Sequence, residues 1–331
     1  MERRAFLGAL TGGLLAAPLA DEAQQAERQR RVGVLMGYAE SDPDAQANVV
    51  AFREALLKLG WAEGRNVQID VRWPVPADLE SMQRFAKELV ALQPDVILSH
   101  ITPTTAALLQ QTRTIPVVFA TVSDPVSSGF VTSFQQPGGN VTGFTSIEPT
   151  MAGKWLQLLK EVAPRVARAA FLFNQATAPY SKYFLTPLNA AAASLGVKVL
   201  ATPVGDTAAL NSVVAGEAHE PNSGLIVCPD SFMDVHRADV TSLAARHRLP
   251  AVYPFHQFSE IGGLLSYGND QIDNYRRAAV YVDRILRGAK PSGLPVQAPV
   301  KFEVVINLKT AKSLGLTIPS SLLARADQVI E

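Results

Sequence analysis

The sequence predicts an α/β fold made of two doubly wound parallel-sheet lobes that are joined by three hinge crossings. Buried-strand patterns and helical patterns alternate at the spacing of βαβ units, which favours parallel sheets with right-handed crossovers. The alternation restarts after Gly143, so the chain holds two such units in succession. A length of 331 residues with 47% hydrophobic residues is enough for two ordinary domains.

The first half of the chain carries the clearest alternation. Apolar or alternating runs predict strands, and apolar residues three and four positions apart predict helices. The strands are expected at 31–36, 67–72, 95–99 and 115–120, and the helices at 47–59, at 79–92 and from 106 onward. The strand over 115–120 runs into the polar loop 121–125, and the extended piece 141–144 leaves for the second half.

The second half repeats this pattern. Strands are expected at 166–173, 197–201, 224–228 and 250–253, and helices at 154–162, 183–195, 207–218 and 235–247. Polar or aromatic residues follow several of these strands. In open α/β sheets, ligands bind in the crevice outside the carboxyl ends of the strands. The loops after the strands are therefore the first place to look for a site.

The end of the chain is too short to form a third domain. It holds a strand and loop at 262–268, a helix at 275–286, a strand at 300–307 and a short helix at 310–314. Because these pieces cannot bury a core alone, we expect them to complete the two sheets, with crossings near Gly143, Pro254 and Pro291. The expected division is 1–30 as signal peptide and linker, 31–144 plus 255–290 as the N-terminal lobe, and 145–254 plus 291–331 as the C-terminal lobe.

Composition argues against several classes of protein. The 30 basic residues balance the 30 acidic ones, so no charge excess points to nucleic acid. A single cysteine excludes an intramolecular disulfide and a cysteine-based zinc site. The five histidines are scattered and form no pair at metal-ligand spacing. We therefore expect neither a metal ion nor another cofactor.

The N-terminus predicts export. Arg3 and Arg4 precede an apolar stretch over 5–20, which is too short to span a bilayer but fits the core of a secretory signal. The paired arginines indicate a candidate twin-arginine signal. The alternative is a buried amphipathic helix, but the polar linker over 22–31 would connect such a helix to nothing. We expect a periplasmic protein that does not span the membrane once mature.

The usual sequence motifs for catalysis are absent. The sequence has no GxSxG elbow, no GxxxxGK[ST] loop, and no GxGxxG after a strand. Asp124 and Asp230 each follow a strand, one in each half. Two such carboxylates suit a glycosidase-like acid and nucleophile, a partner for a ligand ammonium group, or simple turn caps. An enzyme is the least favoured of these interpretations.

The loops are better explained by binding. Thr102 and Thr104 place hydroxyl and N–H groups at a helix start, which favours a carboxylate, although a plain helix cap is the simpler alternative. Aromatic residues at strand ends can clamp a ring or an apolar ligand. Each alone is more readily explained by core or rim packing. They are Tyr38, Phe232, Tyr253, Phe255 and Tyr267.

Two segments carry a resemblance to a known family. The first is GGLLSYG together with the tail YRRAAVYVDRILRGAKPSGLPVQAPVKFEVVINLKTAKSLGLTIPSSLLARADQVIE. The second is IPVVFATVSDPVSSGFVTSFQQPGGNVTGF. The chain resembles the periplasmic substrate-binding proteins of ABC transporters, in the subfamily often named for tryptophan or tyrosine uptake. The resemblance covers nearly the whole chain after the leader. Asp21 and Glu22 depart from the family, which has small or basic residues before the cleavage point.

The resemblance implies a type I periplasmic-binding-protein fold that holds a ligand between its lobes. It also implies a membrane permease with its ATPase as partners, and no catalysis. An aromatic amino acid is the default ligand, and a ligand-sensing module for a signalling partner is the alternative. The family's cleft loops correspond to Gly37, Tyr38, Ser99, Thr102, Thr104, Thr105, Ser123, Asp124, Asn174, Asp230, Ser231 and Phe232.

Overall fold

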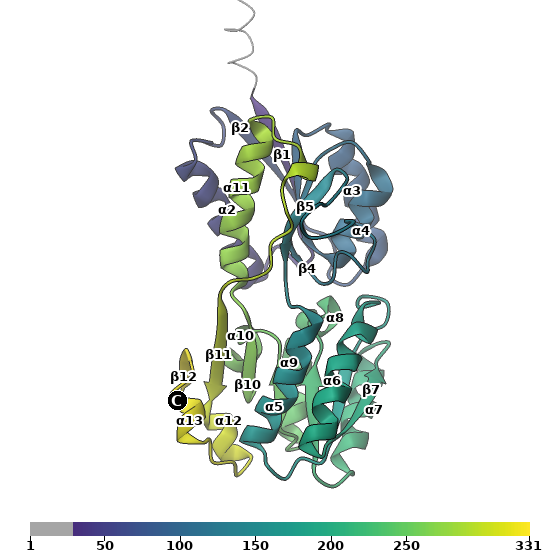
Figure 1. Ribbon diagram of the computed structural model, residues 1–331, viewed down its shortest axis with the longest axis vertical. Coiled ribbons are helices and arrows are strands. Elements are labelled where there is room, and N and C mark those ends of the chain that lie inside the picture. The colour runs from purple at the N-terminus through teal and green to yellow at the C-terminus, as the bar shows by residue number, and fades with distance from the viewer. Residues whose placement is uncertain (1–28) are drawn as a thin grey trace, which may run out of the picture.

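The computed structural model describes residues 29–331, which form two α/β lobes stacked along the long axis of the molecule (Figure 1). The predicted signal peptide and most of its linker lie outside the described residues. Two doubly wound lobes confirm the predicted fold class. Within residues 29–331, no helix combines the length and the apolar character needed to cross a bilayer.

The N-terminal lobe is built on a five-stranded, fully parallel sheet in the order β2-β1-β3-β4-β5. Helices α2 and α11 cover one face and α3 and α4 cover the other (Figure 1). Because both faces are covered, every residue of β3 and β4 is buried. The elements are β1 (Arg30–Leu35), α2 (Pro43–Lys58), β2 (Val67–Arg72), α3 (Leu79–Ala91), β3 (Val96–Ile101), α4 (Thr102–Gln111), β4 (Val117–Val122), β5 (Val141–Thr145) and α11 (Gln271–Leu286).

The C-terminal lobe holds a seven-stranded sheet in the order β12-β11-β10-β9-β8-β6-β7. All pairs are parallel except β10 with β11. The strands are β6 (Arg168–Phe173), β7 (Lys198–Pro203), β8 (Ser223–Val227), β9 (Ala251–Tyr253), β10 (Leu265–Asn269), β11 (Phe302–Asn307) and β12 (Gln328–Ile330). The helices are α5 (Ala152–Val162), α6 (Ser181–Leu195), α7 (Thr207–Ala218), α8 (Ser231–Val235), α9 (Arg237–Arg246), α10 (His256–Glu260), α12 (Leu308–Ser313) and α13 (Ser320–Leu323), with short 3₁₀ turns η1 (Pro149–Met151) and η2 (Pro291–Gly293).

The first crossing between the lobes depends on a glycine. Gly143 in β5 has φ +150, and an added Cβ would lie 2.1 Å from the carbonyl oxygen of Phe119 in β4. Only glycine lets β5 approach β4 this closely. The chain then leaves the sheet after Thr145, as the sequence predicted for this crossing.

The second and third crossings differ from the prediction. Leu265 of β10 pairs with Val252 of β9, so residues 255–269 belong to the C-terminal lobe and the chain crosses at Asn269, not at Pro254. The main-chain N–H of Gln297 donates to Gly143 O at 2.9 Å, so the return crossing follows residue 297 and not Pro291. The physical reason is pairing: a proline marks a turn, but the choice of neighbouring strand sets the lobe.

Candidate functional site

The carboxyl ends of both sheets face one small cavity between the lobes, with a volume of about 20 Å³. This is the crevice that parallel sheets offer to ligands. Polar and apolar atoms contribute equally to its surface, and it lies beside the crossings. Its lining residues are Tyr38, Ile101, Thr102, Pro103, Thr121 and Ser123 from the N-terminal lobe, Ser146 and Gln271 from the crossings, and Tyr180, Pro229, Asp230, Ser231, Asp234 and Phe255 from the C-terminal lobe.

The wall from the N-terminal lobe is held by a hydroxyl network at the β3–α4 turn. Ser99 Oγ lies 3.0 Å from Thr104 Oγ1 and 2.8 Å from Thr105 Oγ1, and all three side chains are buried. Both threonine hydroxyls also donate to Ile101 O. These hydroxyls therefore shape the turn beneath the cavity surface. Thr102 does line the cavity, and its Oγ1 accepts a hydrogen bond from Ser123 N at 3.1 Å.

Asp230 organises the wall from the C-terminal lobe. Its Oδ2 accepts from Asn174 N at 2.6 Å, and its Oδ1 accepts from Phe232 N at 3.0 Å and from the Thr177 hydroxyl. The bonds from Asn174 and Thr177 join the β6–α6 loop to the start of α8, and the bond from Phe232 caps α8. Burial raises the pKa of Asp230 to about 6, although these three hydrogen bonds oppose the rise. Asp230 thus lines the cavity and also acts as a helix and loop cap, which is one of the interpretations that the sequence left open.

Asp234, which the sequence analysis did not single out, is a cavity carboxylate with one oxygen that accepts no hydrogen bond from the described residues. It lies on α8 and is buried, and its Oδ2 accepts from the Tyr38 hydroxyl of the other lobe at 2.6 Å. Its Oδ1 and Ser231 Oγ are buried with no hydrogen-bond partner among the described residues, and both side chains line the cavity. Burial raises the pKa of Asp234 to about 8, and the negative charge of Asp230 adds to the rise.

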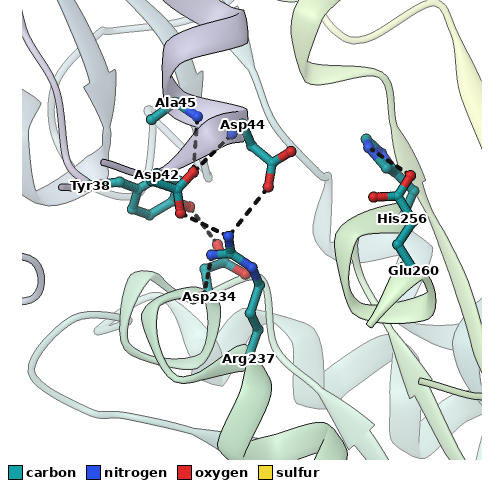
Figure 2. Close-up of polar contacts among 8 residues, drawn as sticks. All are labelled: Tyr38, Asp42, Asp44, Ala45, Asp234, Arg237, His256 and Glu260. Atoms are coloured by element: carbon teal, nitrogen blue, oxygen red, sulfur yellow. Dashed lines mark hydrogen bonds and ion pairs between the residues drawn. The ribbon is translucent and has the colours of Figure 1, made fainter. Parts of the chain in front are cut away.

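Arg237, on the helix that follows α8, pairs with the N-terminal lobe (Figure 2). Its Nη2 lies 2.8 Å from Asp42 Oδ2 and 3.4 Å from Asp44 Oδ2. Asp42 is also the N-cap of α2, because its Oδ1 accepts from the N–H groups of Asp44 and Ala45 at 3.0 Å. Apart from the Lys301–Asp270 pair between two crossings, these are the ion pairs that join the lobes within residues 29–331.

A histidine on α10 lies near the same group of charges (Figure 2). His256 Nδ1 lies 2.7 Å from Glu303 Oε1, and His256 Nε2 lies 3.9 Å from Glu260 Oε1. Burial alone would lower the pKa of His256, but the hydrogen bond to Glu303 and the nearby carboxylates raise it above its ordinary value. Burial raises the pKa of Asp44, and the negative charge of Asp42 adds to that rise. The cluster is therefore electrostatically coupled across the lobes.

An open groove lies on another side of the cavity, with a volume of about 410 Å³. Thr102, Pro103 and Tyr180 line both the groove and the cavity, so the two adjoin each other. The groove runs between α3 and α4 of one lobe and the start of α6 of the other. Apolar and aromatic groups form much of its wall. They are Leu79, Pro103, Ala106, Ala107, Phe130, Ala176, Pro179, Tyr180 and Tyr183, with Gln83, Gln110, Ser127, Ser128, Thr177 and Lys182 as the polar members.

The structure brings part of the predicted site together. The predicted residues that line the cavity are Tyr38, Thr102, Ser123, Asp230, Ser231 and Phe255. Gly37 lies just beneath, where its N–H donates to His100 Nδ1 at 3.2 Å. Asn174 Oδ1 caps the next turn by accepting from Ala176 N at 2.9 Å. These two residues support the walls without lining the cavity.

The other predicted residues lie away from the cavity. Asp124 has a left-handed backbone with φ +46, and its Oδ1 accepts from Ser127 N at 3.1 Å, so it caps its own loop. Phe232 packs against His236, with ring centroids 4.5 Å apart. Tyr253 stacks on Phe258 inside the C-terminal lobe. Tyr267 packs beside Phe302 in the sheet of that lobe.

Several cavity residues were missed in the sequence. Tyr180 and Gln271 open helices whose first turns the apolar spacing did not include. Asp234 lies in α8, a short helix that the prediction missed, because the predicted helix over 235–247 begins four residues after Ser231 and covers mainly α9. The available signal was Asp230 itself, because an N-cap there places residue 234 one turn further on the same helix.

The residues that the structure describes hold no cluster of three or more His, Cys, Asp or Glu side chains arranged for a metal ion. The lone cysteine, Cys228, is buried at the end of β8. Burial raises its pKa well above the ordinary thiol value, which keeps the thiol protonated. The cavity therefore offers hydrogen bonds, one carboxylate with a free oxygen and aromatic surface.

Comparison with known proteins gives three informative relatives. A structure of an ABC domain in complex with L-Trp from Streptococcus pneumonia is 28% identical, covers 92% of this chain and 100% of that chain, and has a TM-score of 0.84. A ligand-free, open substrate binding protein with adhesive properties from Clostridium difficile is 25% identical, covers 91% and 99%, and has a TM-score of 0.68. A tyrosine-binding protein of Clostridioides difficile is 24% identical over 88% of this chain and 82% of its own.

The structure described here superposes more closely on the L-Trp complex than on the open, ligand-free structure, with TM-scores of 0.84 and 0.68. This agrees with the bonds that Tyr38 and Arg237 make across the cavity. The family described as ABC transporter substrate binding protein matches residues 38–330, which include both lobes and all three crossings. The chain belongs to this family of ABC transporter substrate binding proteins.

Proposed function

We propose that this protein captures a small amino-acid-like solute, aromatic by default, between its lobes and delivers it to an ABC permease and its ATPase. The observation that carries the proposal is that the cavity at the strand ends and a largely apolar groove share part of their walls, and that both lie between the two lobes. The cavity suits the zwitterionic head of an amino acid, and the groove suits its aromatic side chain. Relatives that bind L-Trp and tyrosine support the same class of solute.

In this proposal, the carboxylate of the solute lies at the start of α4. Thr102 opens this ten-residue helix and lines the cavity with Ser123. The N-terminal end of a helix carries partial positive charge and favours an anion. The aromatic body extends past Pro103 and Tyr180 toward the groove. Ser231, with its unpartnered Oγ, supplies a further hydrogen bond to the polar head.

Binding is coupled to closure. The solute first contacts one lobe, and rotation about the three crossings then adds contacts from the other lobe. A solute shifts this equilibrium only by its differential affinity for the closed state. Tyr38, Asp42 and Arg237 make contacts that exist only when the lobes meet, so they add to the stability of the closed form. The permease would recognise that form.

Export places this receptor in the periplasm, with the candidate signal at residues 1–30 guiding it there. Catalysis forms no part of the proposal. The paired-carboxylate mechanism has no support, because Asp124 caps its own loop outside the cavity while Asp230 is held by three hydrogen bonds. A receptor needs only binding groups and a hinge.

The test is a thermal-shift screen on protein from which bound solute has been removed by unfolding and refolding. We expect L-tryptophan or L-tyrosine to raise the melting temperature, because a ligand that binds the folded state stabilises it by mass action. Glycine and succinate serve as controls without an aromatic ring. Stabilisation by the controls but by neither aromatic amino acid would contradict the proposed class of solute.

A further inference from the structure

The closed cavity contains a carboxylate that nothing nearby neutralises. Asp234 is 7% exposed, and its Oδ1 has no hydrogen-bond partner among residues 29–331. Its other oxygen accepts one hydrogen bond, from the uncharged Tyr38 hydroxyl. Leaving an ionised carboxylate in this state is costly, because burial removes water without supplying a counter-charge.

The neighbouring charges do not supply it either. Arg237 donates to Asp234 only through the main-chain carbonyl oxygen, at 3.0 Å, while its guanidinium pairs with Asp42 and Asp44. The single positive charge of Arg237 is thus already shared between the carboxylates of Asp42 and Asp44. The titratable and charged groups that face Asp234 from the elements around it are Tyr38 and Asp42 of the other lobe, Arg237 of α9, and Tyr180, Cys228 and Asp230 of the same lobe.

The protein groups that such a counter-charge would contact are both in α8. The unpartnered oxygen belongs to a side chain that lines the cavity, and Ser231 Oγ beside it is also unpartnered. A protonated amine has several N–H donors and one positive charge, so it suits a carboxylate oxygen and a hydroxyl together. A neutral donor would satisfy the hydrogen-bonding capacity of Asp234 Oδ1 but would leave the negative charge of the carboxylate without a counter-charge.

We propose that Asp234 makes closure depend on a cationic ligand, by holding the protonated amine of the solute through its free oxygen in the closed state. The inference rests on the proposed capture of a solute in this cavity, and it names the solute class more narrowly as one with a protonated amine. Without that amine, closure buries a bare carboxylate unless Asp234 takes up a proton.

Closure of the ligand-free protein should therefore depend on pH. In the open state Asp234 is hydrated, with an ordinary carboxylate pKa of about 3.9. In the closed state burial raises the pKa of Asp234 to about 8. A carboxyl group whose pKa rises on closure opposes closure when it is ionised. The ligand-free protein is therefore most reluctant to close above about pH 8, and closes more readily as the pH falls toward 4.

One experiment measures selectivity for the amine. The dissociation constants of L-tryptophan and of indole-3-propionate, which keeps the ring and carboxylate but lacks the amine, are measured for wild type and Asp234→Asn. We expect the preference for L-tryptophan to fall at least about tenfold in the variant. The preference should be unchanged in Asp239→Asn, whose side chain is 58% exposed on α9. An unchanged preference in Asp234→Asn would overturn the inference.

A second experiment needs no ligand. Small-angle X-ray scattering compares the radius of gyration of ligand-free wild type and Asp234→Asn at pH 8 and at pH 5. The wild type should be more compact at pH 5 than at pH 8, and the difference in radius of gyration between the two pH values should be smaller in the variant, since asparagine carries no charge to bury. A variant as extended and as pH-dependent as the wild type would contradict the inference.

The two arms separate this inference from the proposed function. Failure of wild type to bind L-tryptophan would overturn the aromatic assignment, and the scattering comparison would still decide the role of Asp234. Binding of L-tryptophan with an unchanged preference in Asp234→Asn would leave the proposed function standing and remove the inference.

Discussion

Tyr38 of the N-terminal lobe donates a 2.6 Å hydrogen bond to Asp234 of the C-terminal lobe. The tyrosine ring is fixed from behind, edge to face against His100 at 4.6 Å, and burial lowers the pKa of that histidine to about 3. The imidazole therefore stays neutral at physiological pH. A rigid, uncharged support on one lobe thus meets a carboxylate on the other, and both line the same cavity.

Replacing Tyr38 by phenylalanine removes this bond and keeps the ring packing. We expect the affinity for the solute to fall about tenfold, because the bond exists only in the closed state. The melting temperature of ligand-free protein should hardly change. Tyr281→Phe is the matched control, since its hydroxyl donates within one lobe to Pro295 O at 2.7 Å. Tyr38→Phe with wild-type affinity, measured by titration calorimetry, would show that the bond is not part of closure.

The Arg237–Asp42 pair should stabilise closure independently of the solute. Its side chains are only 20% and 13% exposed, so the pair is worth more than a typical surface ion pair. Arg237→Gln should weaken binding about five- to tenfold, mainly through faster dissociation. Arg325→Gln breaks a more exposed pair with Glu161 inside one lobe and should leave binding unchanged. Stopped-flow dissociation rates that are the same for both variants would contradict this role.

Asp230→Ala should act on stability. The change leaves Asn174 N, Phe232 N and the Thr177 hydroxyl without their buried acceptor. We expect a loss of about 2–4 kcal/mol in the free energy of unfolding, measured by chemical denaturation. Asp206→Ala removes an exposed N-cap that accepts from Ala209 N at 2.7 Å, and should cost about 1 kcal/mol. Equal losses in the two variants would mean that burial of the Asp230 bonds adds nothing.

Gly143→Ala tests the first crossing. The new Cβ would lie 2.1 Å from Phe119 O, in a backbone conformation that side chains rarely adopt. We expect a loss of at least about 3 kcal/mol in stability, since β5 must move away from β4. Gly139→Ala, where nothing lies within 4 Å of an added Cβ, is the control. A Gly143→Ala protein with wild-type denaturation would mean that β5 tolerates the shift.

Much of the fold followed from the sequence because local patterns determine local structure. The strand over 67–72 and the helix over 207–218 have the predicted bounds, and the loops after the strands do meet between the lobes. The prediction that residues 255–290 all belong to the N-terminal lobe was wrong for β10, because strand order depends on tertiary packing. Gly268 shows this: an added Cβ would lie 1.7 Å from Pro254 O, a contact that no local pattern predicts.

The site was predicted in part for a related reason. Sequence position shows which residues follow a strand, but not whether their side chains turn toward the cavity. Ser99, Thr104 and Thr105 bond to the β3–α4 turn, while Thr102 beside them lines the cavity. Asp230 and Asp234 are one helical turn apart, and only the pattern of hydrogen bonds distinguishes the cap from the carboxylate with a free oxygen.

The most direct test of capture between the lobes is a crystal structure of the protein saturated with L-tryptophan or L-tyrosine. The account predicts ligand density in the cavity, with the carboxylate at Thr102, the amine at Asp234 Oδ1 and the ring toward Tyr180. Density for the ligand elsewhere on the protein, with the cavity empty and the bonds of Tyr38 and Arg237 unchanged, would contradict it.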